Sequence, residues 1–239
     1  MRAIILAAGR GSRMKYLTSN KPKCLVNLKG KPLLEWQLKA IKDAGIKEIA
    51  IVTGYKKELL APYKLMEFYN NRWLHTNMVV SLTCAEEWLK KGPCVVSYSD
   101  IFYEKSAIVS LTNCSASLAI TYDPNWLTIW NKRFEDPLSD AETFRINTSN
   151  QILEIGNRPN CIEEVQGQFM GLLRITPESW KEIVNALSEL TPTIRKKIQM
   201  TNILQNIVIK KRLAVLGIPY GDAWGEIDTF EDLKVFNSE

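Results

Sequence analysis

The residues with the clearest chemical potential lie near the N-terminus, where two glycines and two basic side chains follow a short apolar run. Gly9 and Gly11 have no side chain that would keep backbone N–H groups away from a phosphate or a base. Arg13 and Lys23 supply positive charge for phosphate oxygens. The spacing therefore predicts a nucleoside triphosphate site. Its expected lining in this segment is Leu6, Ala7, Ala8, Gly9, Gly11 and Ser12.

Two better-known glycine motifs do not fit this segment. A dinucleotide fingerprint needs a third glycine where the chain has Met14, and a P-loop ends in Gly-Lys-Ser/Thr where the chain has Gly-Ser-Arg. The remaining structural alternative is a glycine turn flanked by two solvated basic side chains.

Two carboxylates are candidate ligands for Mg²⁺. Asp100 follows the apolar run 94–99, and ligands of open α/β sheets bind at the carboxyl ends of strands. Asp228 precedes the helical pattern 229–237, and either aspartate could instead be a helix cap. Further candidates for contact with the nucleotide are Asn77, Ser81 and Ser99.

The elements that must position these groups follow from the hydrophobic pattern. Apolar runs alternate with helical patterns in the first half, which is typical of parallel strands joined by crossover helices. We predict strands at 2–7, 48–53, 94–99, 116–122, 143–147, 151–156, 168–175 and 213–218. We predict helices at 33–44, 79–90, 104–112, 177–190, 200–211 and 229–237.

The predicted fold class is α/β, a Rossmann-like three-layer α/β/α arrangement. Its central sheet is expected to be mixed and mostly parallel, with a small antiparallel extension that binds the second substrate. We expect a single domain over residues 1–239, because no linker or repeat interrupts the chain. Residues 1–115 would form the nucleotide-binding half, and 116–239 the acceptor-binding half and C-terminal closure.

Composition is that of a soluble enzyme and argues against several other classes. The net charge of +5 is spread along the chain rather than gathered into a stripe, so no nucleic-acid partner is expected. No apolar run reaches ~18 residues, which predicts a cytoplasmic protein without membrane insertion. Five scattered cysteines and one histidine argue against a zinc site.

The N-terminal motif resembles that of the nucleotidyltransferases that make nucleotide-diphosphate sugars and related activated alcohols. In that superfamily L-A-A-G-x-G-x-R-M/L is followed by K-P-K, which corresponds here to residues 6–14 and 21–23. A late Asp-Thr-x-Glu-Asp-Leu motif matches residues 228–233. The resemblance implies that Asp100 and Asp228 jointly hold Mg²⁺.

Four stretches look more closely like the phosphocholine and 2-aminoethylphosphonate cytidylyltransferase group: 123–126, 130–138, 140–144 and 167–173. This resemblance implies CTP and a small phosphate- or phosphonate-bearing acceptor as substrates. The acceptor oxygen would attack the α-phosphorus while pyrophosphate leaves, so cations must neutralise the developing charge. Arg13 is assigned to the β- and γ-phosphates together with the Gly11-Ser12 backbone, and Lys23 to the α-phosphate or the attacking oxygen. No general base is required.

The predicted acceptor pocket combines aromatic and acidic side chains, which suits a cationic head group. Its expected residues are Tyr122, Trp126, Trp130, Asp140, Glu142 and Gln168. Trp126 and Trp130 are four residues apart, so packing on one helical face is the alternative.

Three functions remain open at this level. The first is an Mg²⁺-dependent cytidylyltransferase for a small phosphorylated or phosphonate amino alcohol. The second is a sugar-1-phosphate nucleotidyltransferase that uses CTP, UTP or dTTP, and the third a non-catalytic module that senses nucleotide. A homo-oligomer is compatible with all three.

Overall fold

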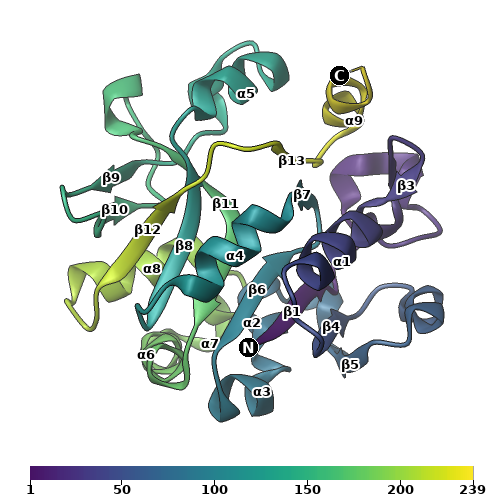
Figure 1. Cartoon of the computed structure of the whole chain (residues 1–239), viewed down its shortest axis with the longest axis horizontal. Helices are drawn as coiled ribbons and strands as arrows, with labels where there is room; N and C mark the ends of the chain where they lie inside the picture. The colour runs from purple at the N-terminus through teal and green to yellow at the C-terminus, as the bar shows by residue number, and fades with distance from the viewer. Residues whose placement is uncertain (239) are drawn as a thin grey trace.

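A computed structural model of the protein describes residues 1–238. Its centre is a seven-stranded sheet in the order β12-β8-β11-β6-β1-β4-β5 (Figure 1). In the described part of the chain, β11 is the one strand of this sheet that runs antiparallel to its neighbours. The strands are β1 (Arg2–Ala7), β4 (Ile49–Thr53), β5 (Met66–Tyr69), β6 (Cys94–Tyr98), β8 (Leu118–Asp123), β11 (Gln168–Ile175) and β12 (Val215–Pro219).

Strand β1 shows why the sheet is covered on both faces. Its side chains alternate between two cores: Ile4 and Leu6 join one, and Ala3, Ile5 and Ala7 join the other. A parallel strand buried on both faces is a continuous apolar run, as this one is.

Helices cover the two faces of the sheet. The core that contains Ile5 takes side chains from α1 (Leu33–Asp43), α4 (Lys105–Asn113) and α5 (Trp126–Arg133). The core that contains Ile4 takes them from α2 (Met78–Thr83), α3 (Glu86–Lys91), α6 (Pro177–Ser188) and α8 (Met200–Ile209). Figure 1 shows α1 and α4 crossing the near side of the sheet. The predicted three-layer, Rossmann-like fold with a mostly parallel sheet is confirmed.

Three small antiparallel sheets lie outside the central one. They are β2 (Asn27–Leu28) with β3 (Lys31–Pro32), β7 (Ile101–Tyr103) with β13 (Trp224–Glu226), and β9 (Phe144–Ile146) with β10 (Ile152–Ile155). The pairing of β7 with β13 brings the C-terminal segment beside the residue that follows β6.

The prediction of one continuous helix over 79–90 is wrong, because this segment forms two short helices, α2 and α3. The N–H groups of Cys84 and Ala85 bond to carbonyls three residues back, at Ser81 and Leu82. These bonds tighten the turn and end α2 before α3 begins. Strands β5, β7 and β13 and helices α5 and α7 (Pro192–Arg195) were not predicted.

The C-terminal helix α9 (Phe230–Asn237) begins at a capping box formed by Thr229 and Asp232. Asp232 also binds the guanidinium of Arg133, with 2.8 Å between Oδ1 and Nε. The Arg133 side chain is 1% exposed, and its Nη1 lies 3.3 Å from an oxygen of Glu226. Arg133 on α5 therefore ties together β13 and the start of α9.

Among residues 1–238, the structure contains no helix whose length and apolar character would let it cross a membrane.

We expect Arg133→Leu to lower the free energy of unfolding by about 3–5 kcal/mol, because it leaves the buried carboxylate of Asp232 and the partly buried Glu226 without their cation. Urea denaturation followed by circular dichroism measures this change. The matched control is Arg145→Leu on β9, an exposed arginine, for which we expect a change within ~0.5 kcal/mol. Equal effects of the two substitutions would contradict the structural role of Arg133.

Candidate functional site

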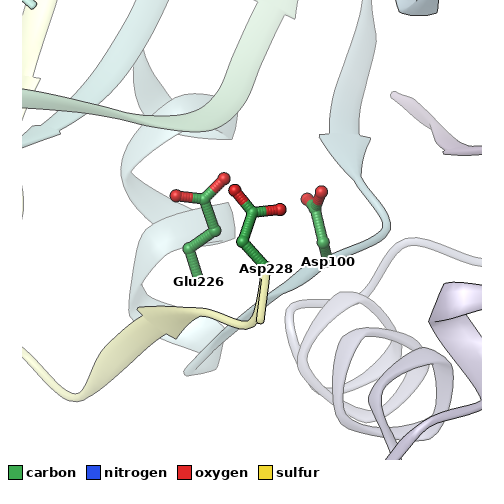
Figure 2. Close-up of side chains that lie close together, drawn as sticks. All are labelled: Asp100, Glu226 and Asp228. Carbon is green, nitrogen blue, oxygen red and sulfur yellow. The ribbon is translucent and has the colours of Figure 1, made fainter. Parts of the chain in front are cut away.

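Three carboxylates converge beyond the carboxyl end of β6. Oxygen atoms of Asp100, Glu226 and Asp228 all lie within 4.8 Å of one another. Figure 2 shows the three side chains next to one another and pointing to the same side, Asp100 from the segment after β6 and the other two from β13 and the residues that follow it. The structure thus brings together both aspartates that the sequence singled out.

Backbone contacts fix the position of this group. The N–H of Ile227 donates to the carbonyl oxygen of Asp100 over 2.8 Å. The N–H of Asp228 donates to Oδ2 of Asp232 over 2.9 Å, so the capping box of α9 also holds Asp228 in place.

Two cations neutralise the aspartates. Nζ of Lys23 lies 2.9 Å from Oδ2 of Asp100 and also binds Oδ1 of Asp228. Nη2 of Arg13 lies 2.7 Å from Oδ2 of Asp228. Because Lys23 bridges both aspartates, the K-P-K segment and the two carboxylates form one group.

Burial and charge act in opposite directions on the pKa values here. Burial alone would lower the pKa of Lys23, but attraction to Asp100 and Asp228 outweighs it and raises that pKa. Burial alone would raise the pKa of Asp228, but Lys23 and Arg13 lower it. Both groups are therefore held in their charged forms.

Glu226 is the member of the group that the sequence analysis missed. Burial, followed by repulsion from Asp228 and Asp100, raises its pKa to about 8. A usable signal was present: Glu226 and Asp228 are two residues apart in an extended segment, and such residues share a side.

The donor set suits a hard divalent cation such as Mg²⁺. Magnesium prefers carboxylate oxygens and is held by one or two of them in phosphate-processing sites. Oδ1 of Asp100 is buried and has no hydrogen-bond partner among residues 1–238, so it retains a lone pair for an additional ligand.

A cavity of about 290 Å³ opens on one side of this group and contains most of the predicted nucleotide contacts. Its lining includes Leu6, Ala8, Gly9, Gly11, Ser12, Asn77, Ser81 and Ser99 together with Arg13, Lys23, Asp100 and Asp228. Ala7 does not line it, because its side chain points into the core on the opposite face of β1.

Gly11 is required where the cavity meets Lys23. Its φ of +74° lies in the left-handed region that favours glycine. A Cβ at this position would lie 2.7 Å from Cβ of Lys23. The glycine therefore allows the loop to approach the lysine closely.

A second cavity, of about 220 Å³, opens on the other side of the carboxylates and is predominantly acidic and aromatic. Among the predicted acceptor residues, it is lined by Trp130, Asp140, Glu142 and Gln168. Trp130 is 3% exposed, and its ring packs against that of Trp126 with 5.9 Å between the centroids. Its indole N–H is buried without a hydrogen-bond partner in the described part of the chain.

Tyr122 and Trp126 do not line this acceptor-side cavity. Tyr122 is buried against Phe144, with 4.8 Å between the ring centroids. Trp126 is 3% exposed, and its indole N–H donates to the carbonyl oxygen of Val165 over 3.0 Å. For Trp126, the structure therefore agrees with the packing alternative that the four-residue spacing had suggested.

The two cavities meet at the charged group. Both are lined by Arg13, Met78, Asp100 and Asp228. A ligand in one cavity and a ligand in the other would therefore meet at the carboxylates and at Arg13. This geometry suits transfer of a group between two bound molecules.

Comparisons with known proteins agree with this geometry. Residues 3–145 match the MobA-like NTP transferase domain. The chain is 35% identical to a CTP:phosphoglutamine cytidylyltransferase of Campylobacter jejuni, with 98% of each chain covered. It is 28% identical to a choline-phosphate cytidylyltransferase of Haemophilus influenzae, over 82% of this chain and 78% of that one.

The fold is shared with the inositol-1-phosphate CTP transferase of T. maritima at a TM-score of 0.77 and 20% identity, over 98% of this chain and 94% of that one. The resemblance predicted from the N-terminal and acceptor-side motifs is confirmed. The chain belongs to the MobA-like NTP transferase family and is a nucleotidyltransferase with cytidylyltransferases among its relatives.

Proposed function

We propose that the protein is an Mg²⁺-dependent cytidylyltransferase that transfers CMP from CTP to a small phosphate- or phosphonate-bearing acceptor with an ammonium group. The observation that carries this proposal is the shared wall of the two cavities, where Arg13, Asp100 and Asp228 face both. Cytosine is proposed because the named relatives use CTP.

In the proposed reaction, an acceptor phosphate or phosphonate oxygen forms a bond to the α-phosphorus of CTP. The bond from that phosphorus to the bridging oxygen of the β-phosphate breaks, and pyrophosphate leaves. The nucleophile is already an anion near neutral pH, so no side chain has to remove a proton. A bound Mg²⁺ would neutralise charge on the triphosphate and the attacking oxygen.

Residues of the chain supply the remaining interactions. Asp100 and Asp228 would hold the metal, with Glu226 close enough to be a third ligand. Arg13 and the N–H groups of the Gly11-Ser12 loop would bind the β- and γ-phosphates. Lys23 would bind the α-phosphate, since it lines the nucleotide cavity beside both aspartates.

The charge of the acceptor-side cavity supports a cationic acceptor. Burial raises the pKa of Asp140, although attraction to Arg133 and Arg13 opposes this shift, and burial also raises the pKa of Glu142. Neither carboxylate has a salt bridge within 4.0 Å in the part of the chain described. An ammonium would compensate them, whereas a neutral sugar would leave them without a cation.

Acceptors named for the relatives meet this requirement. Phosphocholine carries a quaternary ammonium, and phosphoglutamine carries an α-ammonium, an α-carboxylate and an amide. 2-Aminoethylphosphonate carries a primary ammonium and is handled by another relative. Their shared feature is a positive nitrogen a few bonds from a phosphoryl group, which is the acceptor class proposed for this chain.

We expect pyrophosphate release with Mg²⁺, CTP and one or more of these ammonium-bearing acceptors, and none with sugar 1-phosphates. The assay should screen CTP, UTP, dTTP, ATP and GTP against both acceptor classes. Turnover of sugar 1-phosphates alone would instead support the sugar-nucleotide alternative. If no pair of substrates releases pyrophosphate but nucleotide binding is measurable, the result would support a non-catalytic sensor.

Asp100→Asn removes one charge from the proposed metal site, and we expect kcat/KM to fall at least ~100-fold. Isothermal titration with Mg²⁺ and CTP should show weaker metal binding in the same variant. The matched control is Asp43→Asn on α1, an exposed aspartate paired with Lys39. If Asp100→Asn and Asp43→Asn behave alike, Asp100 is not a metal ligand.

Glu142→Gln tests the acceptor side without changing side-chain size. We expect the KM for the ammonium-bearing acceptor to rise about 10-fold or more, because a charge-assisted contact is worth ~1.5–3 kcal/mol. The KM for CTP should stay within ~2-fold, since Glu142 does not line the nucleotide cavity. Glu135→Gln, an exposed glutamate, is the control, and unchanged acceptor KM in Glu142→Gln would contradict the assignment.

The raised pKa of Glu226, about 8 against an ordinary 4.5, makes stability depend on pH. Between these values the folded protein binds more protons than the unfolded chain, so the free energy of unfolding falls as pH rises. The limit is about 1.4 kcal/mol for each unit of pKa difference. In Glu226→Gln, the free energy of unfolding measured by urea denaturation without divalent ions should therefore change less between pH 5 and pH 8. If the variant and the unsubstituted protein show the same pH dependence, the raised pKa of Glu226 is contradicted.

A further inference from the structure

A third cavity, of about 360 Å³, lies beside the nucleotide cavity and takes no part in the chemistry described above. Its volume is within the range of small-molecule sites. The lining comes from the segment before α2, from α2 and α3, and from the region of α6 and α7.

Helix α2 separates this cavity from the nucleotide cavity. Asn77 and Ser81, four residues apart, face the nucleotide cavity. Val80 and Thr83 face the third cavity, and Thr76 lines both. The two cavities are therefore back to back across a helix that is one and a half turns long.

The floor of the third cavity is apolar. Val80, Val184 and Leu187 line it together with Trp180. Trp180 is 2% exposed, and its indole N–H has no hydrogen-bond partner among the described residues. This nitrogen has almost no accessible surface, so Trp180 contributes its ring to the apolar floor and not a hydrogen-bond donor.

The mouth of the cavity is positively charged. Arg72 and Lys196 line it, and neither has a carboxylate within 4.0 Å in residues 1–238. Arg195 also lines it but is held by the carbonyl oxygens of Ser188 and Leu190, at 3.3 and 3.1 Å. Glu86, the acidic residue of the lining, is paired with Lys90 at 2.8 Å.

We propose that this cavity is a second ligand site that binds a small anion with a flat apolar body and is coupled to nucleotide binding. The anionic group, a carboxylate, sulfonate or phosphate, would bind Arg72 and Lys196. The apolar body would cover Val80, Val184 and Leu187 and lie against the Trp180 ring.

Hydrogen bonds between the two sites account for the coupling. The backbone N–H of Asn77 donates to the carbonyl oxygen of Lys196 over 3.1 Å. The Asn77 side-chain amide donates to the carbonyl oxygen of Ile198. A ligand that moves Lys196 or Thr76 would therefore move Asn77, which lines the nucleotide cavity. The site follows from the cavity alone, whereas the coupling rests on the proposed nucleotide binding.

The test uses naphthalene-1-sulfonate, an anion with a flat apolar body, titrated into the full chain by calorimetry. We expect one binding site per chain with or without saturating CTP and Mg²⁺. Arg72→Gln/Lys196→Gln should weaken probe binding at least 10-fold, and Val184→Trp, which fills the cavity, should abolish it. Thermal unfolding of each variant establishes that it is folded.

The matched control is Arg158→Gln/Lys47→Gln, which removes two exposed charges outside the cavity lining and should leave probe affinity unchanged. Coupling should appear as a shift of the CTP dissociation constant that reaches a plateau at saturating probe. The site is overturned if Arg72→Gln/Lys196→Gln and Val184→Trp both still bind the probe. It is also overturned if the CTP dissociation constant keeps rising with probe concentration, because the probe then competes directly with CTP. Probe binding without any shift in the CTP constant overturns the coupling and leaves the proposed cytidylyl transfer unaffected.

Discussion

The structure depends on neutralising three carboxylates that lie within 4.8 Å of one another. Like charges at this separation in a partly buried site repel strongly, so the fold supplies cations for the aspartates, and the raised pKa of Glu226 lets that group take up a proton instead. Lys23 reaches Asp100 and Asp228 across 77 and 205 residues of sequence. Arg133 reaches Asp232 and Glu226 from a different helix. The site is therefore also a set of tertiary contacts that join the N-terminal loop, α5 and the C-terminal segment.

The surrounding fold holds the carboxyl groups and their cations close to one another. A small apolar cluster joins Met14 and Leu33 near the N-terminus to Leu233 and Phe236 on α9. The pairing of β13 with β7 aligns Glu226 with Ile101, next to Asp100. Apolar packing and strand pairing bring the charged groups together, and the ion pairs then fix their distances.

The sequence predicted the parts of the structure that local pattern determines. Strand 2–7, the glycine loop and the position of Asp100 depend on short motifs or on the edge of a parallel sheet. The convergence of Asp100 with Asp228 was implied by the family resemblance. The parts that the sequence analysis missed depend on tertiary context. Trp126 looked available for a ligand, but its N–H is used by Val165, which is 39 residues away. Glu226 needed the short strand β13, whose pairing partner is distant in sequence.

The arrangement of charge gives the acceptor cavity a polarity that bears on substrate choice. Arg13 lies where this cavity meets the proposed nucleotide cavity, and Asp140 and Glu142 line the acceptor-side cavity alone. A zwitterion with a phosphoryl group near Arg13 and an ammonium near the carboxylates would match both regions. A sugar 1-phosphate would match the cation and leave the carboxylates desolvated without compensation. The enzyme would then select its acceptor in two ways. It would make favourable contacts with the ammonium-bearing acceptor, and a neutral acceptor would leave the carboxylates of the cavity unpaired.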